Sequence, residues 1–177
     1  GIPAIVGAEN ATKILKTGLV ISVDGAKGEV YKGAKFTSVM GQEERNVPRI
    51  ETKTKVYVNL AQPEAAERVA KKHVDGIGLL RAEFMMANIG THPKKFIREG
   101  KKQEFINKLV DQLLMFCEPF SPRPIVYRTT DFKTNEYRGL IGGKEYEPIE
   151  SNPMLGYRGA FRYISDPEVF HLELEAI

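Results

Sequence analysis

The sequence predicts an α/β fold in which helices pack over a parallel sheet. Three short apolar segments, 55–60, 76–80 and 124–127, have the composition of strands. The segments between them, 63–73 and about 94–117, have the apolar periodicity of helices. Strands that alternate with helices are joined through right-handed crossovers and lie parallel, so the sheet is expected to be parallel.

Two features define the expected helices. Segment 63–73 places Pro63 in its first turn, where the missing N–H costs nothing, and its alanines and Val69 share one face. The longer segment carries an apolar stripe at spacings of three and four residues, made of Phe105, Leu109, Leu113 and Phe116. A last helix is expected over 166–177, beginning at Asp166 and Pro167. Three strands are fewer than the eight of a closed barrel or the five or six of a doubly wound sheet.

The first part of the chain has a different organisation. Residues 2–6 are expected to form a strand, 11–18 an amphipathic helix, and 19–33 a hairpin across a Gly-containing turn. Residues 34–53 lose periodicity, gain charge and contain Pro48, which indicates a linker. The predicted domains are therefore residues 1–33, a linker over 34–53, and residues 54–177.

Composition excludes several functions. The net charge of +3 is spread along the 177 residues, which gives little support to nucleic-acid binding. No apolar stretch approaches the length of a membrane span and the start lacks the pattern of a signal peptide, so no membrane contact and a cytoplasmic location are expected. The only cysteine, Cys117, is expected to be a buried helix thiol without a catalytic role. The three histidines are scattered, and no metal-ligand spacing is present.

Two of the predicted strands end in arginine. Arg81 follows the second strand and Arg128 the third, at the strand ends where parallel βα folds bind ligands. If the strands are neighbours, two guanidinium groups rise from one rim, and a phosphate or carboxylate is the group that such forks bind. The alternative is that each arginine only caps carbonyl groups or pairs with a surface acid. Spacing alone leaves both interpretations open.

Three further residues are candidates for the same rim. Glu83 lies two residues after Arg81, and Asp131 three residues after Arg128, so each acid is expected to support the arginine that precedes it. Arg158 follows a loop that contains Pro and Gly and that would lie over the rim.

The motifs in this region resemble one enzyme family. The segments GIGLLRAEFMMANIGTHP, DFKTNEYRGL and NPMLGYRGAFRY closely resemble the phosphoenolpyruvate (PEP) synthases, also called pyruvate, water dikinases, and the resemblance extends over residues 1–177. It implies that residues 1–33 are the tail of a swivelling phosphohistidine domain and that 54–177 begin a (β/α)8 barrel that binds PEP or pyruvate. Arg81 and Arg128 match the family's substrate-binding arginines. Arg158 matches the arginine of its NPxLGxR loop, and Asp131 matches the acid after its second arginine.

The same resemblance implies the chemistry of the parent enzyme. Pyruvate, ATP and water would give PEP, AMP and phosphate through a phosphohistidine, with Mg²⁺ as cofactor. The carrier histidine, the acid cysteine and the Mg²⁺ ligands of the family have no counterpart here, so no residue of this chain is expected to be catalytic or to bind metal. The missing initiator Met suggests a piece of a longer chain, inactive alone and completed by the rest of the protein or by a homo-oligomer.

Three alternatives remain open. One is a non-catalytic module that binds PEP or another anion. A second is a stable structural remnant of a larger assembly. The third is a relative of pyruvate phosphate dikinase or of enzyme I of the sugar phosphotransferase system, which share the shorter GLxR and NPxLGxR motifs.

Overall fold

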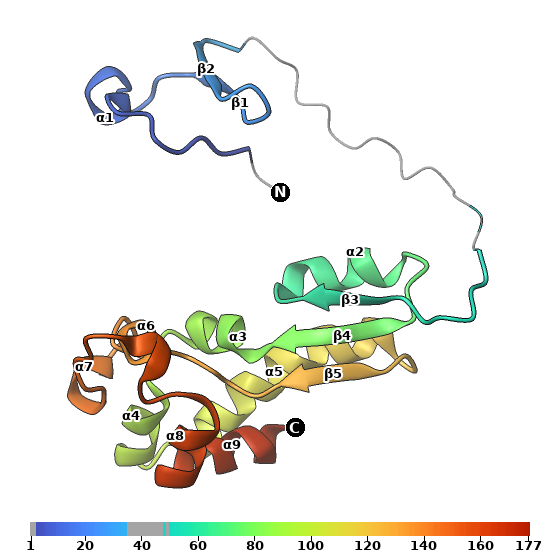
Figure 1. Cartoon of the computed structure of the whole chain (residues 1–177), viewed down its shortest axis with the longest axis vertical. Helices are drawn as coiled ribbons and strands as arrows, with labels where there is room; N and C mark the ends of the chain where they lie inside the picture. The colour runs from blue at the N-terminus through green and yellow to red at the C-terminus, as the bar shows by residue number, and fades with distance from the viewer. Residues whose placement is uncertain (1–2, 35–47, 49) are drawn as a thin grey trace. The chain divides into compact units, whose positions relative to one another are not determined.

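The computed structural model describes residues 3–34, 48 and 50–177, and the chain divides into two units, residues 1–48 and 49–177 (Figure 1). The first unit contains α1 (Ala11–Ile14), β1 (Ile21–Asp24) and β2 (Glu29–Lys32). The second contains β3 (Tyr57–Leu60), η1 (Pro63–Ala65), α2 (Ala66–Ala70), β4 (Gly76–Arg81), α3 (Ala82–Ile89), α4 (Pro93–Arg98), α5 (Lys102–Phe120), β5 (Ile125–Arg128), α6 (Thr134–Tyr137), α7 (Gly143–Tyr146), η2 (Pro153–Leu155), α8 (Gly159–Ser165) and α9 (Glu168–Ala176).

The first unit is a short helix and a hairpin. Strands β1 and β2 pair antiparallel, and Asp24 accepts hydrogen bonds from the backbone N–H groups of Ala26 and Lys27 in the turn between them. The predicted hairpin is thus confirmed, whereas the helix predicted over 11–18 ends at Ile14. The strand predicted over 2–6 is wrong for its described part, because residues 3–6 form no helix or strand and Val6 is 94% exposed. Most of the predicted linker lies outside the described residues.

The second unit is built on a parallel sheet with the order β3-β4-β5. The fold is therefore α/β with parallel strands, as the alternation of strands and helices predicts. Helix α5 runs behind β4 and β5, as Figure 1 shows, and its apolar stripe is buried as predicted, with Phe105, Leu109 and Phe116 fully inaccessible. Ile77 and Leu80 of β4 join this core. On β5 the side chains alternate, so that Val126 is 56% exposed.

The predicted helix over 94–117 is two helices. Helix α4 ends at Arg98 and α5 begins at Lys102, with Gly100 between them at φ +72°. This left-handed conformation ends a helix and favours glycine, and the Lys101 N–H closes the turn on the carbonyl of Phe96 at 2.8 Å. The chain therefore turns at Gly100 and continues as the long core helix α5.

Several short helices were not predicted. Helix α3 starts directly after β4, so Arg81 is at once the last residue of a strand and the N-cap of a helix. Helices α6, α7 and α8 and the turn η2 lie between β5 and α9, where the only predicted feature is a loop before Arg158. These short elements carry most of the residues that surround the strand ends.

Candidate functional site

The two strand-end arginines are neighbours in the sheet. Strands β4 and β5 pair in parallel, and Arg81 is the register partner of Arg128. Both side chains therefore start from the same edge, where the strands give way to α3 and to the loop before α6. The condition for a shared anion site, that these strands be adjacent, is met.

A pocket of about 410 Å³ lies at this edge. All five residues singled out from the sequence line it: Arg81, Glu83, Arg128, Asp131 and Arg158. The other lining residues are Phe84, Ala87, Phe132, Lys133 and Glu136. Four basic and three acidic side chains leave the lining with a formal surplus of one positive charge.

The acids pair with arginines, but not with the ones expected. Glu83 Oε1 accepts from Arg128 Nη2 at 2.6 Å and from the backbone N–H of Asp131 at 3.1 Å. Glu83 thus pairs with the arginine of the neighbouring strand instead of Arg81, because the first turn of α3 directs the Glu83 side chain across the sheet edge. Its Oε2 is buried and has no hydrogen-bond partner within the described residues.

Asp131 likewise forms its ion pair with an arginine that lies further along the chain. Its two carboxylate oxygens accept from Arg158 Nε at 2.9 Å and Nη2 at 2.7 Å, which is the bidentate geometry of an arginine fork. The hydrogen bonds from Arg158 outweigh burial and hold the pKa of Asp131 below its usual value. The predicted pairing of Asp131 with Arg128 is therefore wrong, and Asp131 fixes Arg158 over the pocket.

Arg81 differs from the other two arginines. Within the described part of the chain its guanidinium makes no hydrogen bond or ion pair, and it lies over the ring of Phe84, 5.3 Å from the centroid. Lys133 is also compensated, since its Nζ lies 3.0 Å from Glu136 Oε1. The surplus positive charge of the pocket is therefore located on Arg81.

A buried carboxylate supports the loop after β5. Glu173 of α9 is fully buried, and its Oε1 accepts from the Tyr127 hydroxyl at 2.6 Å and from the N–H and hydroxyl of Thr130 at 2.8 and 2.9 Å. Burial is the largest influence on Glu173 and raises its pKa despite these donors. Thr130 precedes Asp131, so Glu173 holds the backbone from which Asp131 reaches Arg158. Nothing in the sequence distinguishes this glutamate from its exposed neighbours on α9.

A second buried cluster fixes α8, which begins after Arg158. Arg162 donates to both oxygens of Glu147 at 2.6 and 2.7 Å, and His92 Nε2 lies 2.9 Å from Glu147 Oε1. Because His92 Nδ1 accepts from the N–H of Lys94, Nε2 is the nitrogen that donates to Glu147. Burial raises the pKa of Glu147, but the hydrogen bonds from His92 and Arg162 outweigh it and leave the pKa lowered.

The loop before Arg158 is organised by Glu150. Its carboxylate accepts from the Thr134 hydroxyl at 2.6 Å and from the Tyr157 N–H at 2.9 Å. A Cβ on Gly156 would lie 2.3 Å from both carboxylate oxygens. The glycine of the NPMLGYR segment is therefore needed for space: it lets the Glu150 carboxylate reach the backbone just before Arg158.

The structure also places the remaining sulfur and imidazole groups. Cys117 is exposed, which corrects the expectation of a buried thiol: it lies beside the apolar stripe of α5, next to the buried Phe116. His73 and His171 are exposed, whereas His92 is buried. None of these residues lines the pocket at the strand ends.

The acids of the pocket do not by themselves provide a metal site. Within the described residues, no three His, Cys, Asp or Glu side chains gather in a way that could hold a metal ion. Glu83 Oε1 and both oxygens of Asp131 already accept from arginine or backbone donors. These carboxylates orient arginines and do not fit the ligand set of a bound Mg²⁺.

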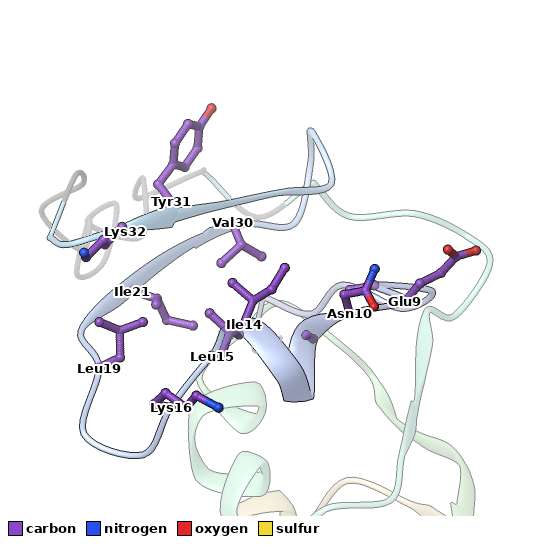
Figure 2. Close-up of a pocket in the computed structure, with 12 residues that line it drawn as sticks. Glu9, Asn10, Ile14, Leu15, Lys16, Leu19, Ile21, Val30, Tyr31 and Lys32 are labelled. Atoms are coloured by element: carbon purple, nitrogen blue, oxygen red, sulfur yellow. The ribbon is translucent and has the colours of Figure 1, made fainter.

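The first unit has a hollow of its own, of about 830 Å³ (Figure 2). Helix α1 and the hairpin line it, and its floor is apolar, formed by Ile14, Leu15, Ile21 and Val30. Its charged residues lie around the apolar floor and form no ion pair with one another among the described residues. Ile14 is 70% exposed, so the hollow is an apolar face of the first unit.

Comparison with known families agrees with the geometry at the strand ends. Residues 40–177 match the PEP-binding domain of PEP-utilising enzymes, and residues 1–28 match the mobile domain of the same enzymes. The chain therefore belongs to the family of PEP-utilising enzymes. The predicted bounds of 1–33, 34–53 and 54–177 stay predictions.

Within that family the chain resembles PEP synthases. It is 46% identical over 186 residues to the phosphoenolpyruvate synthase of Pyrococcus furiosus, and 45% identical over 181 residues to a probable phosphoenolpyruvate synthase of Methanothermobacter thermautotrophicus. The synthase of Aeropyrum pernix is 43% identical over 194 residues. Each alignment covers the whole of this chain but only 23%, 26% and 24% of these three relatives, respectively, so the chain spans about a quarter of these proteins. No helix in the described residues has the length and apolar character of a membrane span.

Proposed function

We propose that this chain forms the anion-binding part of a phosphoenolpyruvate synthase. The parent enzyme would phosphorylate pyruvate with ATP and water, giving PEP, AMP and phosphate through a phosphohistidine. The observation that carries the proposal is the meeting of Arg81, Arg128 and Arg158 around one pocket at the ends of adjacent parallel strands. The family and the names of the relatives support it.

The three arginines would divide the work of binding. Arg81 has no hydrogen-bond or ion-pair partner among the described residues and carries the uncompensated charge, so it would receive the phosphate or carboxylate first. Arg128 and Arg158 are held by Glu83 and Asp131, each with donors left for a ligand. When a phosphoryl group meets the enolate oxygen of pyruvate, guanidinium groups fixed in this way would stabilise the negative charge without reorganising.

The remaining parts of the reaction would come from elsewhere in the enzyme. We propose that residues 54–177 form the first part of a (β/α)8 barrel and that residues 1–33 end the swivelling domain. ATP and Mg²⁺, the carrier histidine and the group that protonates the enolate would be bound or supplied by other regions. Mg²⁺ would add charge neutralisation next to the transferred group. The cytoplasmic location and the homo-oligomeric or larger-chain assembly expected from the sequence stay predictions.

Calorimetric titration of PEP and pyruvate into this chain tests the binding step. We expect millimolar affinity for PEP, and Arg81→Gln should weaken it about tenfold or more, since a charge-assisted contact contributes about 1.5–3 kcal/mol. Arg98→Gln is the matched control, because Arg98 is exposed and lies outside the pocket. Equal affinities in the Arg81 and Arg98 variants would contradict the assignment.

The chemistry is tested in the whole protein that contains this chain. We expect pyruvate-dependent release of AMP and phosphate from ATP, abolished by Arg128→Gln. Pyrophosphate in place of phosphate would indicate a phosphate dikinase, and phosphoryl transfer from PEP to a histidine of a second protein would indicate an enzyme I relative.

One observation favours a second candidate, a non-catalytic module that binds PEP. All the residues found to line the pocket lie between residues 81 and 158 of this chain, so PEP would be able to bind here apart from the chemistry of the other regions. PEP binding by the whole protein without any turnover of pyruvate and ATP would select this candidate.

A further inference from the structure

The contact between Arg81 and Phe84 sets this arginine apart from the other cations of the pocket. The Arg81 guanidinium carbon lies 5.3 Å from the centroid of the Phe84 ring. Arg81 is the N-cap of α3 and Phe84 lies three residues further on, so the helix places the two side chains on one face. The contact is therefore built into the first turn of α3.

An arginine at this position needs such a partner. The amino end of a helix carries partial positive charge and offers a guanidinium group no attraction. The nearby acid, Glu83, is occupied by Arg128 and by the backbone of Asp131. The ring face of Phe84 attracts the cation without accepting any of its N–H groups. It can thus restrain Arg81 and leave every donor available.

The burial of Phe84 supports a role at the pocket instead of in the core. Phe84 is 43% exposed and lines the pocket, whereas its neighbours Met85 and Met86 are buried in the core. Phe84 therefore stands partly outside the core cluster. At the pocket its ring contacts the guanidinium of Arg81.

We propose that Phe84 is a positioning residue that holds Arg81 by a cation–π contact and so sets the affinity of the pocket for the anionic group of its ligand. The inference deepens the proposed function and rests on it. Ion pairs hold Arg128 and Arg158, but they occupy some of the N–H donors and neutralise the charge. The ring of Phe84 holds Arg81 without occupying its donors or neutralising its charge.

Three variants of the whole chain test the proposal. Phe84→Leu removes the ring but keeps an apolar side chain, Phe84→Tyr keeps the ring, and Phe161→Leu is the control, because Phe161 is an exposed phenylalanine outside the pocket. The first readout is the NMR resonance of the Arg81 Nε–H group in the free chain, assigned by its loss in Arg81→Lys. The second is the affinity for PEP and for inorganic phosphate.

We expect Phe84→Leu to shift the Arg81 resonance and to weaken binding about two- to fivefold, the range that an exposed cation–π contact can account for. Phe84→Tyr should keep both values close to those of the unsubstituted chain, and Phe161→Leu should change neither. The proposal would be overturned if Phe84→Leu left the resonance and the affinity unchanged. It would also be overturned if Phe84→Tyr changed them as much as Phe84→Leu does. If the wild-type chain binds neither PEP nor phosphate, the proposed function fails, while the resonances still decide whether Phe84 holds Arg81.

Discussion

Removing the carboxylate of Glu147 should destabilise the second unit strongly. Glu147 and Arg162 are 0% and 9% exposed in their side chains and share two hydrogen bonds of 2.6 and 2.7 Å. In Glu147→Ala the guanidinium of Arg162 stays buried without its counter-charge, and His92 loses its acceptor. Breaking a buried pair in this way costs about 3–5 kcal/mol, a large fraction of the 5–15 kcal/mol that typically stabilises a domain.

The assay is urea denaturation followed by far-UV circular dichroism, because the chain has no tryptophan. The matched control is Glu145→Ala, which breaks a pair with Arg98 of similar length, 2.8 Å, but exposed to solvent, and which should leave the midpoint nearly unchanged. Glu147→Ala combined with Arg162→Met should lose less stability than Glu147→Ala alone, since the unpaired buried charge is gone. A loss below about 1 kcal/mol in Glu147→Ala, or strict additivity in the double variant, would refute this account of the cluster.

The same carboxylate predicts a direction for the pH dependence of stability. The folded chain lowers the pKa of Glu147 relative to the unfolded chain. Its contribution is therefore fully present above the unfolded value of about 4.3 and is lost as the pH falls through the folded value. Glu147→Gln should reduce this acid sensitivity, which denaturation midpoints measured from neutral to acidic pH would show.

Three further predictions concern the loops and the thiol. Gly156→Ala should cost about 1–2 kcal/mol, because the new Cβ displaces the flexible end of the Glu150 side chain from two hydrogen bonds; Glu150→Gln in the same background should recover little, and a neutral Gly156→Ala would contradict the steric argument. Arg158→Gln should raise the pKa of Asp131 toward its ordinary value, observable by carbon NMR titration, and an unchanged titration would show that Arg158 does not control this carboxyl. Cys117 should react with a thiol reagent in the folded chain, more slowly than free cysteine because partial burial raises the pKa of its thiol; a thiol that reacts only in denaturant would contradict its exposure.

The sequence predicts those parts of the fold that depend on local composition and on the spacing of apolar residues. The parallel strands, the hairpin and the apolar stripe of α5 depend on composition and spacing, which a single chain displays directly. The break at Gly100 and the short helices after β5 were missed because one glycine and a few buried polar contacts decide them. Glu147 and Arg162 are buried only because they face each other, and a charged residue in a sequence gives no sign of its partner.

The five residues predicted for one rim do line one pocket, but their ion pairs differ from those that the sequence suggests. Strand-end position brings Arg81 and Arg128 together, because neighbouring parallel strands end at one edge. Which acid meets which arginine depends on the direction of α3 and of the loop after β5. Sequence proximity therefore suggested pairs that the structure replaces with Glu83–Arg128 and Asp131–Arg158.

The presence of carboxylates in the proposed anion pocket has a physical reason. Three uncompensated guanidinium groups at one sheet edge would repel one another whenever no ligand is bound, and their long side chains would separate. Glu83 and Asp131 remove most of this repulsion and fix two of the forks, which leaves one net charge to attract a ligand. Because two arginines are neutralised, the pocket attracts an anion less strongly at long range. Because they are also fixed, their geometry is already formed before the ligand binds. A site of this kind favours small anions whose oxygens fit the fixed forks over anions of equal charge and different shape.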